Sequence, residues 1–577
     1  MMKKRKCIAG FLILVLTAGV FLSACSGNKP EPPANEVPKT TEAAGTASAS
    51  DSETFDDPVT ETTSVEVADD ITQRVHLTWY LPFSWWDTNW NGEVQQYVME
   101  KTGVDLELDV PVGDGNERLN MMMAANDLPD IVSAEWWYPP ALTELKSGFL
   151  LPLEPLIEEA GAYSIWDNVG SVVLERWRFE DGELYTIPSF YYNLDAFPPD
   201  RLPGMGFLAV RKDIYEAIGS PAMWTSPDDF IEACRMAVDA YPEVDGMPLI
   251  PMLLMGELNG SNWSQVSDMV TQSFNAFFTI KEDAIEGRPT RQRENTKDMF
   301  FFINRMVREG FILPDALTDR QTQIDEYAAS GRVFIAQFMN DIPLHMQEAA
   351  ERFNTEYIPI ISLHNSKGEP PRKQTDGGGG FGWFETFIST NCNDPISAIK
   401  FLEYLSSMEN QLMGRYGLQG VHWDYDANGE VELKPETIEA LLTGDTDFQE
   451  AAGIGWAKNL IQNNFDIVNP LPAITPERVL DIMHYRTMFT IDDRALISVQ
   501  GPSDSEDQYN VNARIINEEW TRTIPLLVLA ESDAEFNDIW NSYNEYIDNN
   551  GAIENFQKLV QYTIELEDHL GMTTLVR

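Results

Sequence analysis

Positive charge is scarce in this sequence. Its 577 residues carry 40 Lys and Arg against 92 Asp and Glu, which gives a formal net charge of −52. Nucleic-acid binding needs a basic surface that displaces counterions, and adhesion to anionic lipid needs the same kind of surface. The composition therefore argues against both functions, and we expect no nucleic-acid partner. It favours an acidic protein that meets neutral or cationic molecules.

Cysteine and histidine are also scarce. The four cysteines are Cys7, Cys25, Cys234 and Cys392, and the six histidines show no ligand-like spacing. A chain of this length does not need a disulfide, so we expect Cys234 and Cys392 to be buried thiols. The sequence also lacks a Gly-x-Ser-x-Gly elbow and a dinucleotide-binding fingerprint. It therefore predicts no catalytic residues, no cofactor and no metal.

The first 25 residues have the pattern of a bacterial lipoprotein signal. A basic cluster at residues 3–6 precedes an apolar run from Cys7 to Leu22, which is short for a membrane span. The run ends in Leu-Ser-Ala-Cys, which resembles a lipobox with Cys25 as the lipidated residue. We expect residues 1–24 to be removed and Cys25 to carry a palmitate-type anchor. An ordinary signal peptide or a single N-terminal anchor is the alternative interpretation.

Residues 25–70 are predicted to form a lipidated, disordered tether. They are rich in Pro, Glu, Thr, Ser and Ala and contain almost no large apolar residues. Such a segment cannot bury enough surface to offset the entropy lost on ordering. The tether would place the folded part on the extracellular side of the cell membrane, as in surface lipoproteins of the Gram-positive type. We expect residues 26–70 to be dispensable for ligand binding.

The rest of the chain reads as an α/β protein. Residues 74–80 and 104–110 alternate as strands, residues 94–102 and 118–126 read as helices, and residues 128–132 enter a buried strand. This alternation predicts a mainly parallel sheet, in which ligands bind beyond the carboxyl ends of the strands. Aromatic clusters at residues 85–90 and 136–138 follow two of these strands.

Several segments, taken in order, resemble family 1 of the extracellular solute-binding proteins, the maltose-binding-like lipoproteins of sugar ABC importers. The resemblance covers about residues 71–577. The segments are Leu128–Ile131, Gly182–Pro188, Phe207–Asp213, Ser220–Phe230, Ser330–Ile335, Lys400–Leu405 and Gly417–Trp423.

The resemblance implies a two-lobed periplasmic-binding-protein-like (type II) α/β fold with a hinge. Lobe 1 would hold residues 71–203 and 359–400, and lobe 2 would hold residues 204–358 and 401–577. The implied function is to capture an oligosaccharide or similar polar solute between the lobes and deliver it to ABC permease subunits. The protein would be a monomer and not an enzyme.

Two stretches bear on calcium, which some members of that family bind. Residues 241–249 occupy the place of the family's calcium loop but offer too few oxygen ligands. Residues 424–429 begin like an EF-hand loop, yet the twelfth position is Pro435 instead of a glutamate. We therefore expect Asn428-Gly429 to form a hairpin turn.

The candidate ligand-binding residues combine aromatic and polar side chains. Sugar rings present apolar C–H faces that stack on flat aromatic surfaces, while carboxylates, amides and Arg bind the hydroxyls. The aromatic candidates are Trp85, Trp86, Trp136, Trp137, Tyr191, Tyr192, Trp383 and Trp423. The polar candidates are Asp87, Glu135, Asn340, Asp341, Glu385, Arg415 and His422. In a strand, one Trp of each pair must point away from the core, whereas in a loop both can be exposed. Phe300–Phe302 should face the core. Core packing is the alternative for each Trp.

Two other functions stay open at this point. A surface glycan-binding or sensory lipoprotein without a transporter would share the same site chemistry. A lipid-anchored glycoside hydrolase would need a carboxylate pair at the right separation, and carboxylates are so abundant here that their presence favours nothing. Aromatic richness favours a glycan as the ligand, but peptides and other solutes are not excluded.

Overall fold

The computed structural model describes most of the chain beyond residue 73. The predicted signal peptide and tether lie outside the described residues. The described residues are 74–135, 145, 148–179, 181–195, 204, 207–220, 224–254, 274, 292–313, 321–338, 342, 344–360, 363–371, 380–468, 470–475, 480, 482–483, 485, 501–502 and 506–571. Among the helices they form, we find none with the length and apolar character that a membrane crossing requires.

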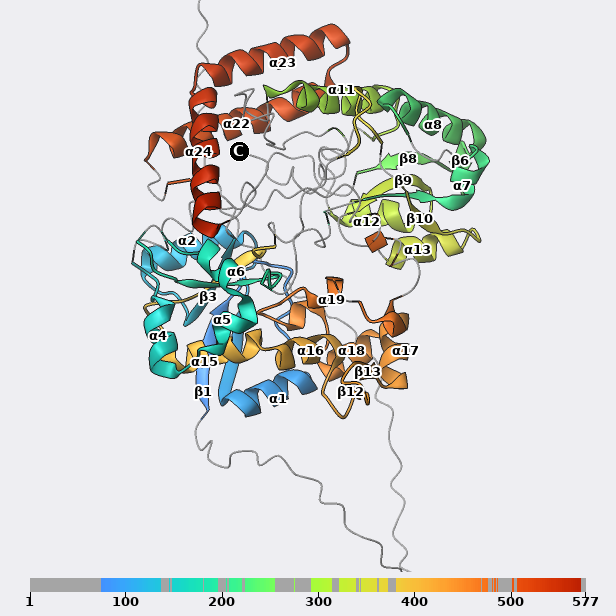
Figure 1. The fold of residues 1–577 in the computed structure, drawn as a ribbon. Helices are drawn as coiled ribbons and strands as arrows, with labels where there is room; N and C mark the ends of the chain where they lie inside the picture. The colour runs from blue at the N-terminus through green and yellow to red at the C-terminus, as the bar shows by residue number, and fades with distance from the viewer. Residues whose placement is uncertain are drawn as a thin grey trace, which may run out of the picture. The chain divides into compact units, whose positions relative to one another are not determined.

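The first sheet has five strands in the order β2-β1-β3-β11-β4. Figure 1 labels two of them, β1 and β3. The strands are β1 (Val75–Tyr80), β2 (Val104–Asp109), β3 (Ile131–Glu135), β4 (Thr186–Ser189) and β11 (Phe384–Ile388). β1 pairs in parallel with β2 and β3, whereas β11 is antiparallel to both β3 and β4. All strands but β11 therefore run the same way, as the alternation of strands and helices predicted.

Helices cover both faces of this sheet. Successive side chains of a strand point to opposite faces, so apolar residues on both faces need a cover. Leu77 and Trp79 of β1 contribute to one core, and Tyr80 contributes to the other. The first core includes residues of α1 (Glu93–Thr102), α4 (Leu153–Ala160), α5 (Ser164–Val169), α6 (Ser171–Arg176) and α15 (Pro395–Ser406). The second includes Leu119 and Met123 of α2 (Gly115–Ala125).

The second sheet has four strands in the order β10-β5-β9-β8. They are β5 (Phe207–Arg211), β8 (Ile250–Leu253), β9 (Val333–Phe338) and β10 (Tyr357–Ile360). β8 and β9 are parallel, and β5 is antiparallel to both β9 and β10. This sheet departs from the predicted parallel pattern at β5, which runs against its three companions.

An aromatic core forms around the helices associated with the second sheet. Its helices are α8 (Pro227–Ala240), α11 (Glu294–Arg308), α22 (Gln508–Leu529) and α23 (Asp533–Asp548). Phe300 and Phe302 are buried in it, as expected, and so is Cys234; Cys392 is a second buried free thiol. On the other face of the sheet lie residues of α12 (Gln321–Ala329) and α13 (Leu344–Glu351).

The remaining elements are short, apart from the last helix. They are β6 (Glu243–Val244), β7 (Met247–Pro248), β12 (Trp423–Tyr425), β13 (Val431–Leu433), α7 (Lys212–Ala217), α16 (Met408–Tyr416), α17 (Pro435–Thr443), α18 (Thr446–Ala452), α19 (Phe465–Val468), α24 (Ala552–Leu570) and the 3-10 helices η4 (Trp456–Lys458) and η5 (Pro472–Ile474). β12 and β13 pair in an antiparallel hairpin, and Gly429 in its turn has φ 84°. The predicted hairpin is therefore confirmed.

The residues that pack against each sheet can be compared with the predicted lobe boundaries. The division into lobes itself stays a prediction. Phe401, Leu402 and Ile461 belong to the core of the first sheet, whereas we expected residues after 400 in lobe 2. β10 spans the expected boundary at residue 359 and pairs in the second sheet. Phe401, Leu402 and Leu405 share one face of α15 at helical spacing, and that face packs against the first sheet.

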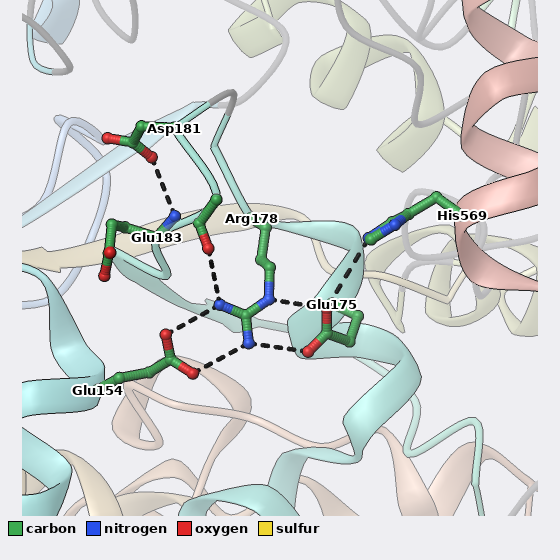
Figure 2. A network of polar contacts seen from close by, with 7 residues as sticks. Glu154, Glu175, Arg178, Asp181, Glu183 and His569 are labelled. Carbon is green, nitrogen blue, oxygen red and sulfur yellow. Dashed lines mark hydrogen bonds and ion pairs between the residues drawn. The ribbon is translucent and has the colours of Figure 1, made fainter.

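A network around Arg178 joins α4, α6 and α24 (Figure 2). The Arg178 guanidinium donates to both carboxylate oxygens of Glu154 (2.9 and 3.0 Å) and to both of Glu175 (2.7 and 2.9 Å). Its hydrogen bond holds the pKa of Glu154 below the usual value. His569 Nε2, in the last turn of α24, lies 3.8 Å from Glu175. Tyr562 of the same helix contacts Tyr509 of α22, so α24 contacts both α6 and α22.

Candidate functional site

Seven aromatic side chains gather at one edge of the first sheet, and we call them the aromatic platform. They are Phe83, Trp85, Trp86, Phe190, Trp383, Phe384 and Trp456. Three follow β1, one follows β4, two stand at the start of β11, and Trp456 opens η4. Phe384 pairs with Glu135 and Ser189, the last residues of β3 and β4. The platform therefore lies at the carboxyl edge of the parallel strands, where the sequence predicted a ligand.

The rings of the platform lie in mutual contact. Trp383 stacks on Phe83 at 4.8 Å and on Trp85 at 6.0 Å, with interplanar angles of 19° and 14°. Trp456 contacts Trp85 at 5.5 Å and Trp86 at 5.6 Å. Trp85 is 54% exposed and Trp456 is 46% exposed, whereas Trp86 is 3% exposed. Two adjacent indoles thus offer open surface, and both contact other rings of the platform.

This arrangement suits a ligand with flat apolar faces and polar edges. An exposed indole carries a large apolar surface in a fixed orientation, and a sugar ring can stack on it. Within the described part of the chain, no acceptor reaches the buried Nε1 of Trp86. A buried donor without a partner is costly, but at 3% exposure Trp86 offers a ligand almost no surface in this conformation.

Lys458 stands two residues after Trp456 and is nearly buried. Its Nζ donates to Asp87 Oδ2 (2.5 Å), to Glu450 Oε2 (2.9 Å) and to the backbone oxygen of Asn89 (2.7 Å). Partial burial would raise the pKa of Asp87, but the hydrogen bonds from Lys458 and from Asn89 N–H hold it below the usual value. The ammonium therefore joins the loop after β1 to the segment that carries Trp456.

A second polar group contacts the backbone of Trp456. Arg415 Nε lies 3.1 Å from Asp466 Oδ2. In the amide orientation that satisfies both of its ends, Gln462 accepts from Arg415 Nη2 (2.7 Å) and donates to the Trp456 backbone oxygen (3.0 Å). Arg415, a predicted ligand residue, is thus engaged with its neighbours in this structure.

Four other predicted site residues are found at or near this edge. Trp85 is exposed and Trp86 is buried; both lie in the loop after β1, so the expectation for a pair in a strand does not apply to them. Trp383 is half-buried within the platform. Glu135 ends β3 and accepts from Asn116 Nδ2 (2.9 Å), and burial raises its pKa.

Five predicted site residues are buried, so they offer a solute little or no surface in this conformation. Tyr191 donates to the Asn168 backbone oxygen, Glu385 accepts from Thr186, and Trp423 donates to the Gly417 backbone oxygen. Burial lowers the pKa of His422, whose Nδ1 accepts from Leu418 N–H. Their contact with a ligand stays a prediction. The five are Tyr191, Tyr192, Glu385, His422 and Trp423.

The remaining candidates, Trp136, Trp137, Asn340 and Asp341, lie outside the described residues. Sequence reasoning missed Trp456 and Lys458. The signal for Trp456 was weak, since it is a single Trp after Gly-Ile-Gly in a stretch without periodicity. Its contacts to Trp85 and Trp86 join segments about 370 residues apart, which no local pattern shows.

The stretches considered for calcium form short hairpins. At residues 241–249, β6 and β7 pair around Asp245 and Gly246, which both have positive φ. At residues 424–430, the Asp426 carboxylate accepts from the N–H groups of Asn428 and Glu430. Within the described residues, no group of three or more His, Cys, Asp or Glu side chains is placed to hold a metal ion.

Comparison with solved structures identifies the fold, although no family model and no curated protein matches this sequence. The Streptococcus pneumoniae ABC-transporter substrate-binding protein FusA, solved with kestose, matches with a TM-score of 0.63 and 17% identity over 85% of this chain and 100% of that one. The alginate-binding protein AlgQ2 matches with a TM-score of 0.60 and 17% identity over 86% and 99%. A solute-binding protein from Bifidobacterium longum infantis, described as binding HMO, matches with a TM-score of 0.61 and 12% identity over 87% and 100%.

The chain has the fold of an ABC-transporter substrate-binding protein. The predicted two-lobed α/β class is confirmed, because these neighbours share that fold and match along nearly their whole length. The resemblance inferred from the sequence agrees with them as well. The neighbours are binding proteins rather than enzymes.

Proposed function

We propose that this protein is the substrate-binding component of an ABC importer and captures an extracellular oligosaccharide. One observation carries the proposal: two adjacent exposed indoles, Trp85 and Trp456, stand at the carboxyl edge of the first sheet. The fold also supports the proposal, because two proteins that share it bind glycans. FusA was solved in complex with kestose, and AlgQ2 is described as an alginate-binding protein. Transfer of the ligand to permease subunits completes the proposed role.

The proposed mechanism is reversible binding without chemistry. Sugar rings stack on Trp85 and Trp456, the two exposed indoles of the platform. A ligand that contacts both lobes only when they are closed shifts the population toward the closed form. The closed form is then the one that a permease recognises. No bond of the ligand is made or broken.

The proposed location is the outer side of the cell membrane, with a lipid on Cys25. The basic cluster, the apolar run and the Leu-Ser-Ala-Cys sequence support this proposal. Growth with labelled palmitate should label the protein, and Cys25→Ser should abolish the label and release the chain from the membrane fraction. Label retained on Cys25→Ser would contradict lipidation at this residue. We propose a monomer, which sedimentation of residues 26–577 would check.

A thermal-shift screen tests the binding function. Residues 26–577 are mixed with neutral oligosaccharides, acidic oligosaccharides, monosaccharides and peptides, because a ligand of the folded state raises Tm. We expect a saturable shift with one class of oligosaccharide. Trp85→Ala and Trp456→Ala should remove that shift. Tyr163→Ala is the control: it removes an exposed ring directly before α5, outside the platform, and should keep the shift.

Two outcomes would contradict the proposal. Shifts with peptides alone would assign the platform to another class of solute. Breakdown of the bound glycan by the purified protein would indicate a hydrolase. A glycan-binding or sensory lipoprotein without a transporter would bind in the same way, so uptake of the labelled glycan by cells with and without the gene separates that role from import.

A further inference from the structure

The two exposed indoles of the platform come from distant parts of the chain. Trp85 lies in the loop after β1, and Trp456 lies in η4, close to the C-terminal end of α18. Neither segment is a regular strand or a long helix that would fix a side chain by itself. Their rings are nevertheless 5.5 Å apart with an interplanar angle of 36°. Besides the ring contacts, polar contacts between the two segments hold them at this distance.

Lys458 is placed to do so. Its side chain is 6% exposed, whereas the carboxylates of Asp87 and Glu450 are 41% and 49% exposed. Asp87 follows Trp86 directly, and its contact to Lys458 joins positions 371 residues apart. Asn89 adds a third bond through its backbone oxygen. The ammonium is thus buried at the junction, and the more exposed carboxylates surround it.

The backbones of the two segments touch at the same junction. Trp90 Nε1 donates to the Lys458 backbone oxygen (3.0 Å), and Gln95 Nε2 donates to the Gly453 backbone oxygen (3.0 Å). A Cβ added at Gly92 would lie 2.4 Å from Gly453 Cα, so only glycine permits this approach. These contacts bring the segments together, but none of them reaches the residues between Trp85 and Asn89. Among the described side chains of η4, Lys458 is the one that hydrogen-bonds that part of the loop. Asn89 Nδ2 also donates to Glu450 Oε2 of α18 (3.2 Å), and Glu450 is itself bonded to Lys458.

We propose that Lys458 is the positioning residue of the aromatic platform. By holding Asp87 and Asn89 against η4, it keeps Trp85 and Trp456 side by side before any ligand arrives. A preformed site loses less conformational freedom on binding, so its affinity is higher. Lys458 itself need not touch the ligand. The consequence for glycan affinity rests on the proposed function, but the effect on the indole pair does not.

Circular dichroism of the unliganded protein tests the proposal. Two indoles in contact give a coupled signal in the far-UV spectrum, and the difference between the parent chain and Trp456→Phe isolates the part that involves Trp456. In Lys458→Met, which keeps the length of the side chain and removes its charge, we expect this difference to be largely lost. Lys458→Arg should restore part of it. Lys212→Met, which removes an ion pair to Glu356 at α7, is the matched control and should leave it intact.

The outcomes are distinct. A full Trp456 difference signal in a folded Lys458→Met would overturn the proposal. If Lys458→Met fails to fold, Asp87→Asn serves instead, because its half-exposed side chain can be changed without a cavity, and a full signal there would also overturn it. A lost signal with no glycan bound by any variant would support Lys458 as the positioning residue while contradicting the proposed function. If a glycan does bind, Lys458→Met should weaken its affinity at unchanged stoichiometry.

Discussion

The aromatic platform and the aromatic core around α8, α11, α22 and α23 use the same residue types for opposite purposes. In the core, Phe300 contacts Trp520 at 5.1 Å, and Trp520 contacts Tyr543 at 5.1 Å. Trp520 is 2% exposed, whereas Trp85 and Trp456 of the platform are about half exposed. The core rings project from long helices, and the platform rings project from loops and a 3-10 turn. The backbone that presents an indole, and not the count of indoles, separates a binding surface from a core.

The largest expected effect lies in the core. Trp520→Ala should lower the free energy of unfolding by about 3–5 kcal/mol, since it removes a fully buried ring and leaves a cavity. Urea denaturation followed by far-UV circular dichroism measures this loss. Trp85→Ala should cost less than about 1 kcal/mol, because the side chain is already half in water. Equal losses in the two variants would break the contrast between core and platform.

The next effect should appear in binding. With the oligosaccharide found by the thermal-shift screen, Trp85→Ala or Trp456→Ala should weaken binding by about 2 kcal/mol, or roughly 30-fold. Isothermal titration calorimetry measures the affinity directly. Phe301→Leu changes a ring of α11 that packs against the aromatic core. This variant should keep the parent's affinity for the oligosaccharide as long as the protein is folded. A platform variant with full affinity would mean that the ligand does not stack there.

Much of the first sheet could be predicted from local patterns. The strand expected at residues 74–80 is β1, the strand expected at 104–110 is β2, and the helix expected at 94–102 is α1. These elements alternate or repeat cleanly, and Gly103, with φ 70°, ends α1 where predicted. The C-terminal region forms the helices α22, α23 and α24, and the chain turns after Leu529 and again at Gly551.

The candidate site was predicted only in part. Trp85 and Trp86 could be singled out as a pair, but their opposite exposures in the loop after β1 could not be predicted from the sequence. Trp456 could not be found because its neighbours in space come from the loop after β1. Arg415 and Asp87 were expected to meet a ligand, and their acidic or basic partners are visible only in three dimensions.

A smaller effect on stability should arise from Asp130, which directly precedes β3 of the first sheet. Its carboxylate accepts from Thr78 N–H (2.9 Å), Thr78 Oγ1 (2.8 Å) and Asn393 N–H (3.1 Å). Burial would raise its pKa, but these hydrogen bonds hold it below the usual value. A depressed carboxyl pKa stabilises the folded state above the unfolded pKa of about 4, and this contribution is lost as pH falls through the folded pKa.

Asp130→Asn should therefore lower the free energy of unfolding at neutral pH by about 1–3 kcal/mol and flatten its decline in acid. Urea denaturation between neutral pH and pH of about 3 measures both. Asp228→Asn, at an exposed carboxylate on α8, is the control and should follow the parent profile. If both variants keep the parent's acid profile, Asp130 does not set the acid response of the first sheet.

The smallest expected effect is at the N-terminus. A chain that begins at residue 71 should match the chain that begins at residue 26 in both Tm and ligand affinity, because the predicted tether contains almost no residues able to join a core. Differential scanning calorimetry and calorimetric titration compare the two. A loss of affinity in the shorter chain would show that residues 26–70 take part in binding.

The position of β11 between β3 and β4 governs when the first sheet can form. β4 leaves the ribosome about 195 residues before β11, which is about 10–40 s at usual rates of synthesis. During that time β3 and β4 have no strand between them, and their free edges can pair with other chains. Assembly of this sheet is therefore a late event that depends on contacts distant in sequence, and such contacts form slowly. The interval before β11 appears is when the growing chain most needs protection from aggregation.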